Sequence, residues 1–326
     1  MTTRKTLTFS LASMGMLLLI LDGKTAMESA AAGVDLCLRS VIPSLFPFLF
    51  LSALITDSLW GSRLPIPKTL TRQLGIPEGA EALLIPGFLG GYPAGARAIA
   101  QACRAGKLEK ATAEHLLGFC SNAGPAFLFG ITAGAFPSLW MVWCLWGIHI
   151  LSAVITGLLD FHRSCGQTTL PAAESSASGQ LRGTVGVMGA ICGWVLLFRI
   201  LLGFWDRWFF WLFPEAVQVL LWGILELSNG CCRLAEVASL PDRFVICSAM
   251  LAFGGVCVTM QTASVTEGLS LKPYLRGKLT QTAVSVVLSL ALIRRGWLVF
   301  AGLTIALLLF LPLVKKRSSI PTLSGV

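Results

Sequence analysis

Long apolar stretches alternate along the whole chain with short stretches in which charged residues cluster. Most of the apolar stretches have the length that a helix needs to cross the hydrocarbon of a bilayer. This pattern predicts an all-α, polytopic membrane protein with about eight transmembrane helices, some of them broken or re-entrant. The apolar stretches are residues 7–21, 34–60, 83–100, 116–136, 139–159, 183–202, 208–225, 244–263 and 280–314.

The composition and the charge agree with this class. The chain is 55% hydrophobic and only 13% charged, whereas an ordinary soluble domain has about 25% charged residues. Its net charge of +9 comes from basic residues at the ends of apolar stretches and near both termini, where they orient a membrane protein with those ends in the cytoplasm. We therefore expect the lipid bilayer as a partner, no nucleic acid, and an even number of crossings.

Three of the apolar stretches contain residues that interrupt a helix. The first has four glycines and two prolines within residues 86–97, and such a segment cannot remain a continuous helix. Similar interruptions fall at residues 120–125 and 252–255. Broken backbone at membrane depth is tolerated only where protein packs on it or a wet cavity faces it. The breaks therefore predict a cavity.

The chain divides near its middle at a stretch rich in serine, glycine and threonine. We predict a first membrane half at residues 1–159, a linker at 160–182, a second half at 183–314 and a basic cytoplasmic tail at 315–326. Broken segments in corresponding places of two halves are typical of transporters built from inverted repeats. Residues 7–21 are interpreted as the first membrane helix, and a cleaved signal peptide is the alternative.

The break at residues 121–125 supplies the first candidate site residues, Ser121, Asn122, Gly124 and Pro125. Half-helix ends expose backbone amides, and amides at a helix N-terminus favour a carboxylate or a phosphate. The alternative is a simple loop at the membrane surface, and the residues alone leave both interpretations open.

A second group of candidates comes from the other half of the chain. Glu226 and Asn229 are three residues apart, so they share a helical face, and an acidic residue in apolar surroundings is usually functional. The alternative for Glu226 is an interfacial carboxylate that only caps a helix. Gln261 is predicted to complete the site, with interhelical hydrogen bonding as its alternative role. Arg97 either neutralises an anionic substrate or extends to the membrane interface.

The sequence has no motif that predicts an enzyme, a cofactor or a metal site. Three histidines lack metal-ligand spacing, and most of the ten cysteines lie within apolar stretches without a C-x-x-C pair. We therefore expect no catalytic residues, no cofactor and no metal ion.

Several motifs occur in the order found in a known family. Together they resemble the sporulation integral membrane proteins of the YlbJ type, which carry the nucleoside-recognition or Gate domain. The motifs are VIPSLFPF at 41–48, GGYPAGA at 90–96, FCSNAGP at 119–125, GILELSNG at 223–230, FGG at 253–255 and QT at 261–262.

The resemblance implies a membrane protein that moves dipicolinic acid toward the forespore during sporulation, located in the outer forespore membrane. The Gate domain is similar to part of the concentrative nucleoside transporters, but the chain lacks a recognisable copy of their full binding set. The leading hypothesis is a transporter or facilitator of a small organic anion. A non-transporting assembly factor and a nucleoside transporter are the alternatives, and the protein partners considered are a second copy or other sporulation membrane proteins.

The hypothesis predicts one substrate site that combines the breaks and the polar residues. Its residues are Gly90, Gly91, Tyr92, Pro93, Arg97, Ser121, Asn122, Gly124, Pro125, Glu226, Asn229, Gly254, Gly255 and Gln261.

Overall fold

The computed structural model describes residues 3–160 and 176–317, and within these ranges the regular structure is entirely helical. The α-helices of the first half are α1 (Thr3–Leu21), α2 (Gly23–Leu36), α3 (Ile42–Leu59), α4 (Lys68–Gln73), α5 (Leu84–Phe88), α6 (Ala94–Arg104), α7 (Lys110–Leu117), α8 (Pro125–Phe127) and α9 (Leu139–Leu159). Those of the second half are α10 (Ala177–Trp208), α11 (Glu215–Leu225), α12 (Leu227–Cys232), α13 (Leu240–Phe253), α14 (Gly255–Val265), α15 (Lys272–Arg295) and α16 (Trp297–Arg317).

Four helices in the described ranges are long and apolar enough to cross a membrane. They are Gly23–Leu59, which joins α2 and α3 through a π-helical turn, then α9, α10, and Leu240–Val265, which joins α13 and α14. Shorter apolar helices are found at Lys5–Leu21, Pro125–Ala135, Glu215–Leu225 and Trp297–Leu308. The prediction of an all-α, polytopic membrane protein is confirmed.

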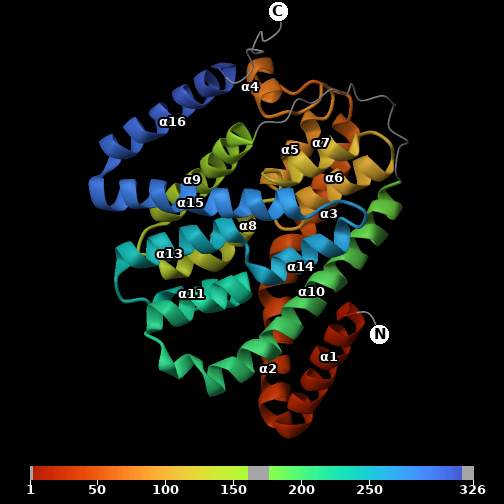
Figure 1. Cartoon of the computed structure of the whole chain (residues 1–326), viewed down its shortest axis with the longest axis vertical. Coiled ribbons are helices and arrows are strands. Elements are labelled where there is room, and N and C mark those ends of the chain that lie inside the picture. Colours follow the sequence, from red (N-terminus) through yellow and green to blue (C-terminus); the bar gives the residue numbers. More distant parts are fainter. Residues whose placement is uncertain (1–2, 161–175, 318–326) are drawn as a thin grey trace, which may run out of the picture.

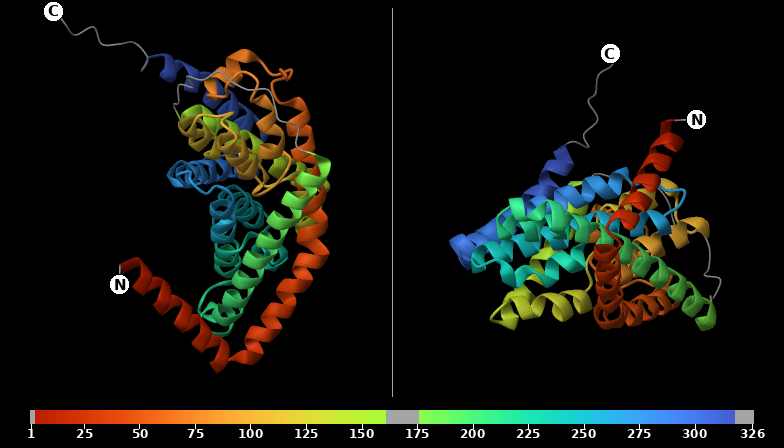
Figure 2. Two further views of the ribbon diagram at one scale, coloured as in Figure 1. Left: turned by 90° about the vertical axis from the view of Figure 1, so that its right-hand side faces the viewer. Right: turned by 90° about the horizontal axis from the view of Figure 1, so that it is seen from below.

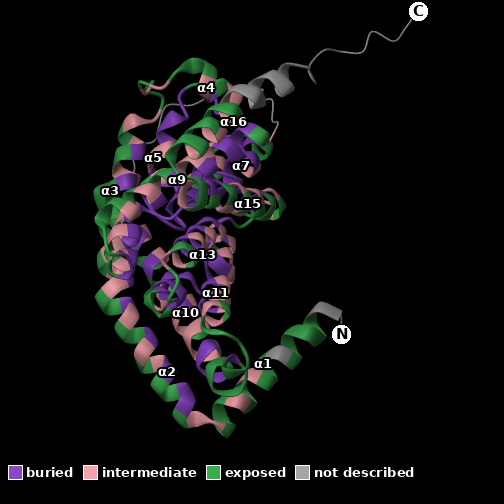
Figure 3. Cartoon of the chain, turned by 90° about the vertical axis from the view of Figure 1, so that its left-hand side faces the viewer, coloured by how far each residue is buried: buried purple, intermediate pink, exposed green. Residues whose placement is uncertain are grey.

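The long helices frame the molecule. Helix α10 packs along α2 and α3, and these segments run together down one side of the helical body (Figure 1). Helix α1 turns away from the far end of α2 and projects from the body (Figure 2). Apolar side chains of α1 such as Phe9 and Ile20 are exposed, and buried residues concentrate in the body instead (Figure 3). Such exposure suits a helix whose surroundings are lipid.

Helix α15 buries its polar side and exposes its apolar side, the reverse of a surface helix in a water-soluble protein. Lys278 is only 1% exposed, whereas the neighbouring Leu279 is 62% exposed. The buried polar residues follow one another at spacings of three or four, so they form one face of the helix. They are Lys278, Gln281, Ser285 and Ser289. A polar face turned inward and an apolar face turned outward is the arrangement expected where lipid is the solvent.

The structure differs from the sequence predictions at several boundaries. Residues 208–225 were predicted to span the membrane, but α10 ends at Trp208 and α11 has only 11 residues, about 16 Å of helix. Pro214 precedes α11 and provides no N–H for a continuous helix. Helix α10 begins at Ala177, inside the predicted linker. Residues 161–175, and residues 318–326 of the tail, lie outside the described ranges.

Candidate functional site

Three interruptions predicted from glycine and proline are breaks in the structure. Helices α5 and α6 are separated by residues 89–93, α7 and α8 by residues 118–124, and α13 and α14 by Gly254. Gly91, Gly254 and Gly255 have φ values of +82°, +81° and +88°, which residues with a side chain rarely adopt. The glycines are therefore required by the backbone conformation at these points.

The first two breaks lie against each other at backbone distance. A Cβ added to Gly124 would stand 2.9 Å from the nitrogen of Gly91, and one added to Gly95 would stand 2.0 Å from the carbonyl oxygen of Cys120. Only glycine permits this contact. Two segments about thirty residues apart in the sequence thus form one packed unit.

The third break joins the same unit through an aromatic side chain. The Tyr92 ring covers Gly254, whose added Cβ would lie 3.2 Å from the ring. The Tyr92 hydroxyl donates a hydrogen bond to the carbonyl of Leu251 at 3.1 Å. Gly255 lies against the carbonyl of Gly223 near the end of α11, at 2.9 Å from an added Cβ. Segments of both halves of the chain therefore converge.

A buried lysine ties the breaks to α15. The Lys278 ammonium donates to the Tyr92 hydroxyl at 3.0 Å, to the Ser121 carbonyl at 2.6 Å and to the Gln281 side-chain oxygen at 2.7 Å. Gln281 in turn donates to the Asn122 side-chain oxygen at 2.9 Å. None of the ion pairs among the described residues includes Lys278. The lysine is held by neutral oxygens alone.

Side chains also satisfy the backbone groups that the breaks release. The Asn122 amide donates to the carbonyls of Gly87 at 3.0 Å and Phe119 at 2.7 Å. The backbone N–H of Ala123 donates to Nε2 of His149 at 3.0 Å. Because lipid provides no partners for broken backbone, these bonds stabilise non-helical segments inside the helical body.

Glu226 stands at a fourth interruption, between α11 and α12. Its carboxylate accepts from the backbone N–H groups of Ser228 at 3.1 Å and Asn229 at 2.7 Å, and from the Asn229 side-chain amide at 2.6 Å. Glu226 is buried. Glu226 precedes α12 and caps its first turn, which is the alternative role that the sequence left open for this carboxylate.

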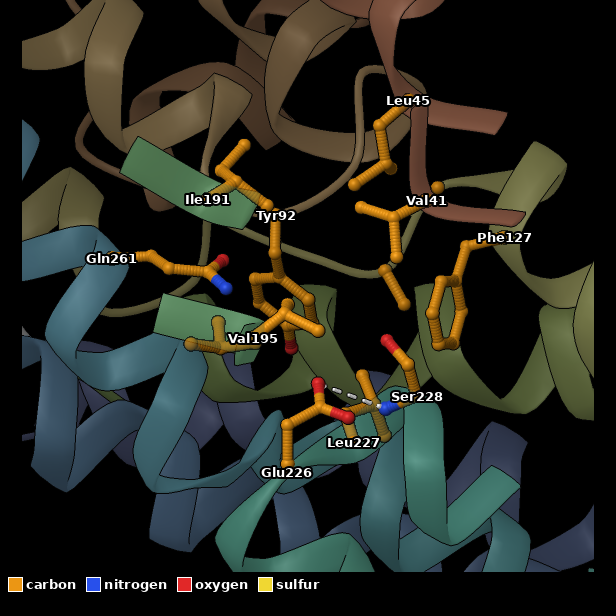
Figure 4. A pocket seen from close by; sticks show the side chains of 13 residues that line it. Val41, Leu45, Tyr92, Phe127, Ile191, Val195, Glu226, Leu227, Ser228 and Gln261 are labelled. Carbon is orange, nitrogen blue, oxygen red and sulfur yellow. Dashed lines mark hydrogen bonds between the residues drawn. The ribbon is translucent and has the colours of Figure 1, made fainter. Parts of the chain in front are cut away.

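A small cavity with a volume of about 20 Å³, room for about one water molecule, lies where these segments meet. Figure 4 shows Tyr92, Glu226 and Gln261 gathered around this space, with Phe127 on another side. The lining residues are Val41, Leu45, Tyr92, Ala123, Gly124, Phe127, Ile191, Val195, Glu226, Leu227, Ser228, Val258 and Gln261.

Two π-helical turns adjoin the cavity. Cys37–Val41 ends at a lining residue, and Leu128–Thr132 follows directly after Phe127. Such turns are rare and are frequently found at functional sites. The lining is mostly apolar with a few converging polar groups, as in small-molecule sites.

The structure divides the fourteen predicted site residues into three groups. Tyr92, Gly124, Glu226 and Gln261 line the cavity. Nine others belong to the breaks or hydrogen bonds around it, namely Gly90, Gly91, Pro93, Ser121, Asn122, Pro125, Asn229, Gly254 and Gly255. Arg97 does not reach this cavity and lines a separate hollow. It is buried, at 6% exposure, and its alternative role at the membrane interface stays a prediction.

The residues that hold the breaks together have little local signal in the sequence. Lys278 lies in a charged stretch that follows a break, which predicts an extramembrane segment, and no motif includes Gln281 or His149. The signal for α15 was present in the spacing of its polar residues, which repeats every three or four positions. His149 has no such signal, because its partner, the N–H of Ala123, comes from another helix.

At the end of α9, outside the membrane-spanning stretch, an acidic residue links three helices. Asp160 lies 3.4 Å from the His115 ring of α7 and pairs with Arg276 of α15. The His115 hydrogen bond, with that of Arg276, outweighs burial and lowers the pKa of Asp160 to about 2. Within residues 3–160 and 176–317, no group of three or more His, Cys, Asp or Glu side chains is placed to hold a metal ion.

Comparison with known proteins finds a sporulation protein. The chain is 25% identical over 317 residues to the sporulation integral membrane protein YlbJ of Bacillus subtilis (strain 168), in a match that covers 81% of this chain and 76% of that protein. No protein-family model matches the chain, and no solved structure matches it. The match confirms the resemblance predicted from the ordered motifs: over most of its length this chain is similar to the YlbJ-type sporulation integral membrane proteins.

Proposed function

We propose that the chain is a membrane transporter or facilitator of a small organic anion, with its solute site at the small cavity lined by Tyr92, Gly124, Glu226 and Gln261, which widens to admit the solute. One observation carries the proposal: four interrupted segments, distant in the sequence, converge on one cavity within the helical body. Interrupted helices that meet at a shared cavity are the arrangement by which secondary transporters bind their solutes.

The anionic character of the solute is inferred from the charges around the cavity. The hydrogen-bond partners of the Lys278 ammonium are neutral oxygens. One of them is the hydroxyl of Tyr92, whose side chain lines the cavity, so a single hydrogen bond links the ammonium to the cavity wall. A solute carboxylate near Tyr92 would add the negative charge that this buried cation lacks. The carboxylate of Glu226 already accepts three hydrogen bonds, which reduces its repulsion of an anion.

The sporulation name of the relative suggests which solute to test first. We propose dipicolinic acid, moved toward the forespore across its outer membrane, because the family resemblance implies this compound. It is a planar dicarboxylate, and both carboxylates can accept hydrogen bonds from amides at the breaks.

Flux of radiolabelled dipicolinate into proteoliposomes that contain only this chain tests the proposal. We expect flux in the wild type and a loss of about tenfold or more in each of two variants. Asn122→Ala removes a buried hydrogen-bonding amide, and Glu226→Gln removes the charge that strengthens the hydrogen bonds to the carboxylate. The matched control is Glu215→Gln, an exposed carboxylate at the start of α11, which should transport normally. Unchanged flux in both site variants would refute the site.

The two alternative functions give different results in the same vesicles. A nucleoside transporter would carry a labelled nucleoside in preference to dipicolinate. An assembly factor would carry neither solute, and sporulation would instead be impaired by charge changes at Arg104, Lys107 and Lys110. Both outcomes contradict anion transport.

A further inference from the structure

A second, larger hollow lies beside the cavity described above, between α3, α6 and the first turns of α10. Its volume is about 340 Å³, and it is partly open to the outside. Its charged and amide-bearing lining residues are Asp57, Arg97, Gln101, Lys107 and Gln180. Within this lining, two cationic side chains face one carboxylate.

Arg97 is the buried cation of this hollow. Its guanidinium donates to the Thr184 hydroxyl of α10 at 3.2 Å. It packs closely against α10 at Gly183, where an added Cβ would stand only 2.5 Å from Nη2. No ion pair of the described residues includes Arg97. A guanidinium has five N–H donors, so Thr184 uses only a small part of its capacity.

The surroundings of Arg97 add further positive potential. Helix α10 begins at Ala177, and Gly179 and Gln180 of its first turn line the hollow. The N-terminus of a 32-residue helix carries a partial positive charge. The Lys107 ammonium lies 5.1 Å from the Trp60 ring at another wall. The one carboxylate in the lining, Asp57, accepts a hydrogen bond from Gln180, and its negative charge also attracts the Arg97 guanidinium.

We propose that this hollow binds the carboxylate group of a small organic anion through the Arg97 guanidinium. The proposal rests on the proposed transport function, because that function supplies the anion. A planar guanidinium with unused N–H groups binds a carboxylate through two parallel hydrogen bonds. Thr184 and Gly183 are positioning residues that hold the guanidinium toward the hollow. Arg97 thus forms a binding site separate from the cavity at Glu226.

The test measures binding of dipicolinate to the purified full-length chain in detergent by isothermal titration calorimetry. Loss of a charge-assisted pair of hydrogen bonds predicts that Arg97→Gln weakens binding about tenfold to hundredfold. Arg97→Lys keeps the charge and loses the planar geometry, so an intermediate affinity is expected. Thr184→Val should weaken binding by a smaller factor. The matched control is Arg104→Gln, on the same helix but exposed, which should bind like the wild type.

The outcomes separate this site from the transport function. Weaker binding in Arg97→Gln than in Arg104→Gln supports the site, whether or not vesicles show flux. If dipicolinate binds and crosses vesicles, but the two arginine variants bind it equally, the site is refuted while transport stands. If inorganic phosphate binds more tightly than dipicolinate and depends on Arg97, the carboxylate assignment is refuted.

Discussion

The lysine network predicts a specific pattern of stabilities for Lys278 and Gln281. Replacing Gln281 by Leu removes the acceptor 2.7 Å from the Lys278 ammonium and the donor 2.9 Å from the Asn122 oxygen. A hydrogen bond to a charged group contributes about 1.5–3 kcal/mol and a neutral one about 0.5–1.5 kcal/mol. We therefore expect Gln281→Leu to lower the free energy of unfolding by about 2 to 4 kcal/mol.

Replacing the lysine itself should be milder. Lys278→Met loses the same bond to Gln281, but it also removes an ammonium that is 1% exposed. Keeping such a charge away from water costs several kcal/mol, and replacing buried charges by apolar groups is often neutral. We expect Lys278→Met to lower the free energy of unfolding by about 0 to 2 kcal/mol.

The double variant isolates the interaction between the two side chains. Without the ammonium, Gln281→Leu loses only its neutral bonds, so its effect should fall to about 1 kcal/mol. The coupling free energy is then about 1 to 3 kcal/mol. Reversible unfolding by sodium dodecyl sulfate in mixed micelles measures all four proteins. Effects that add to within about 0.5 kcal/mol would refute the network as the main support of the breaks.

Two further predictions concern packing and pH. Gly95→Ala should prevent folding, because the new Cβ would lie 2.0 Å from a carbonyl oxygen. The matched control is Gly189→Ala in the middle of α10, whose new Cβ meets nothing within 4 Å and should stabilise the protein by about 0.5–1 kcal/mol. Comparable yields of folded protein for both variants would contradict the packing of the breaks. The pKa of Asp160 is lowered from an ordinary 3.8 to about 2 by His115 and Arg276, so its contribution is complete above the ordinary pKa and is lost as pH falls through the lowered value. Thermal unfolding should therefore show a smaller acid-induced loss of stability in Asp160→Asn than in the wild type, and identical pH profiles would contradict this role.

The breaks were predictable because their causes are local. Glycine and proline at residues 86–97 interrupt a helix whatever surrounds them, and the structure places non-helical backbone at residues 89–93. The left-handed backbone of Gly254 is likewise explained by its residue type. Interruption is a property of the residues themselves, so a single sequence suffices to find it.

The partners of the breaks were not predictable in this way. Lys278 follows a glycine in a stretch with other basic residues, which resembles an extramembrane segment, yet its contacts with Tyr92 and Ser121 bury it. Those contacts span more than 150 positions of the chain, and one sequence carries no signal for a pair so far apart. The position of Arg97 in a separate hollow has the same cause. It is set by Thr184, 87 positions away, whereas the nearby break at residues 89–93 predicts a place at the cavity.

The central claim is that the broken segments surround a water-accessible cavity inside the membrane body. Cysteine labelling tests it in a variant whose ten native cysteines are replaced. A charged, membrane-impermeant thiol reagent should modify Ser228→Cys and Gln261→Cys, which line the cavity, and dipicolinate should slow the reaction. The reagent should not modify Leu279→Cys or Val287→Cys, on the outward, apolar face of α15. Labelling of the outward face with no reaction at the two cavity positions would contradict the account.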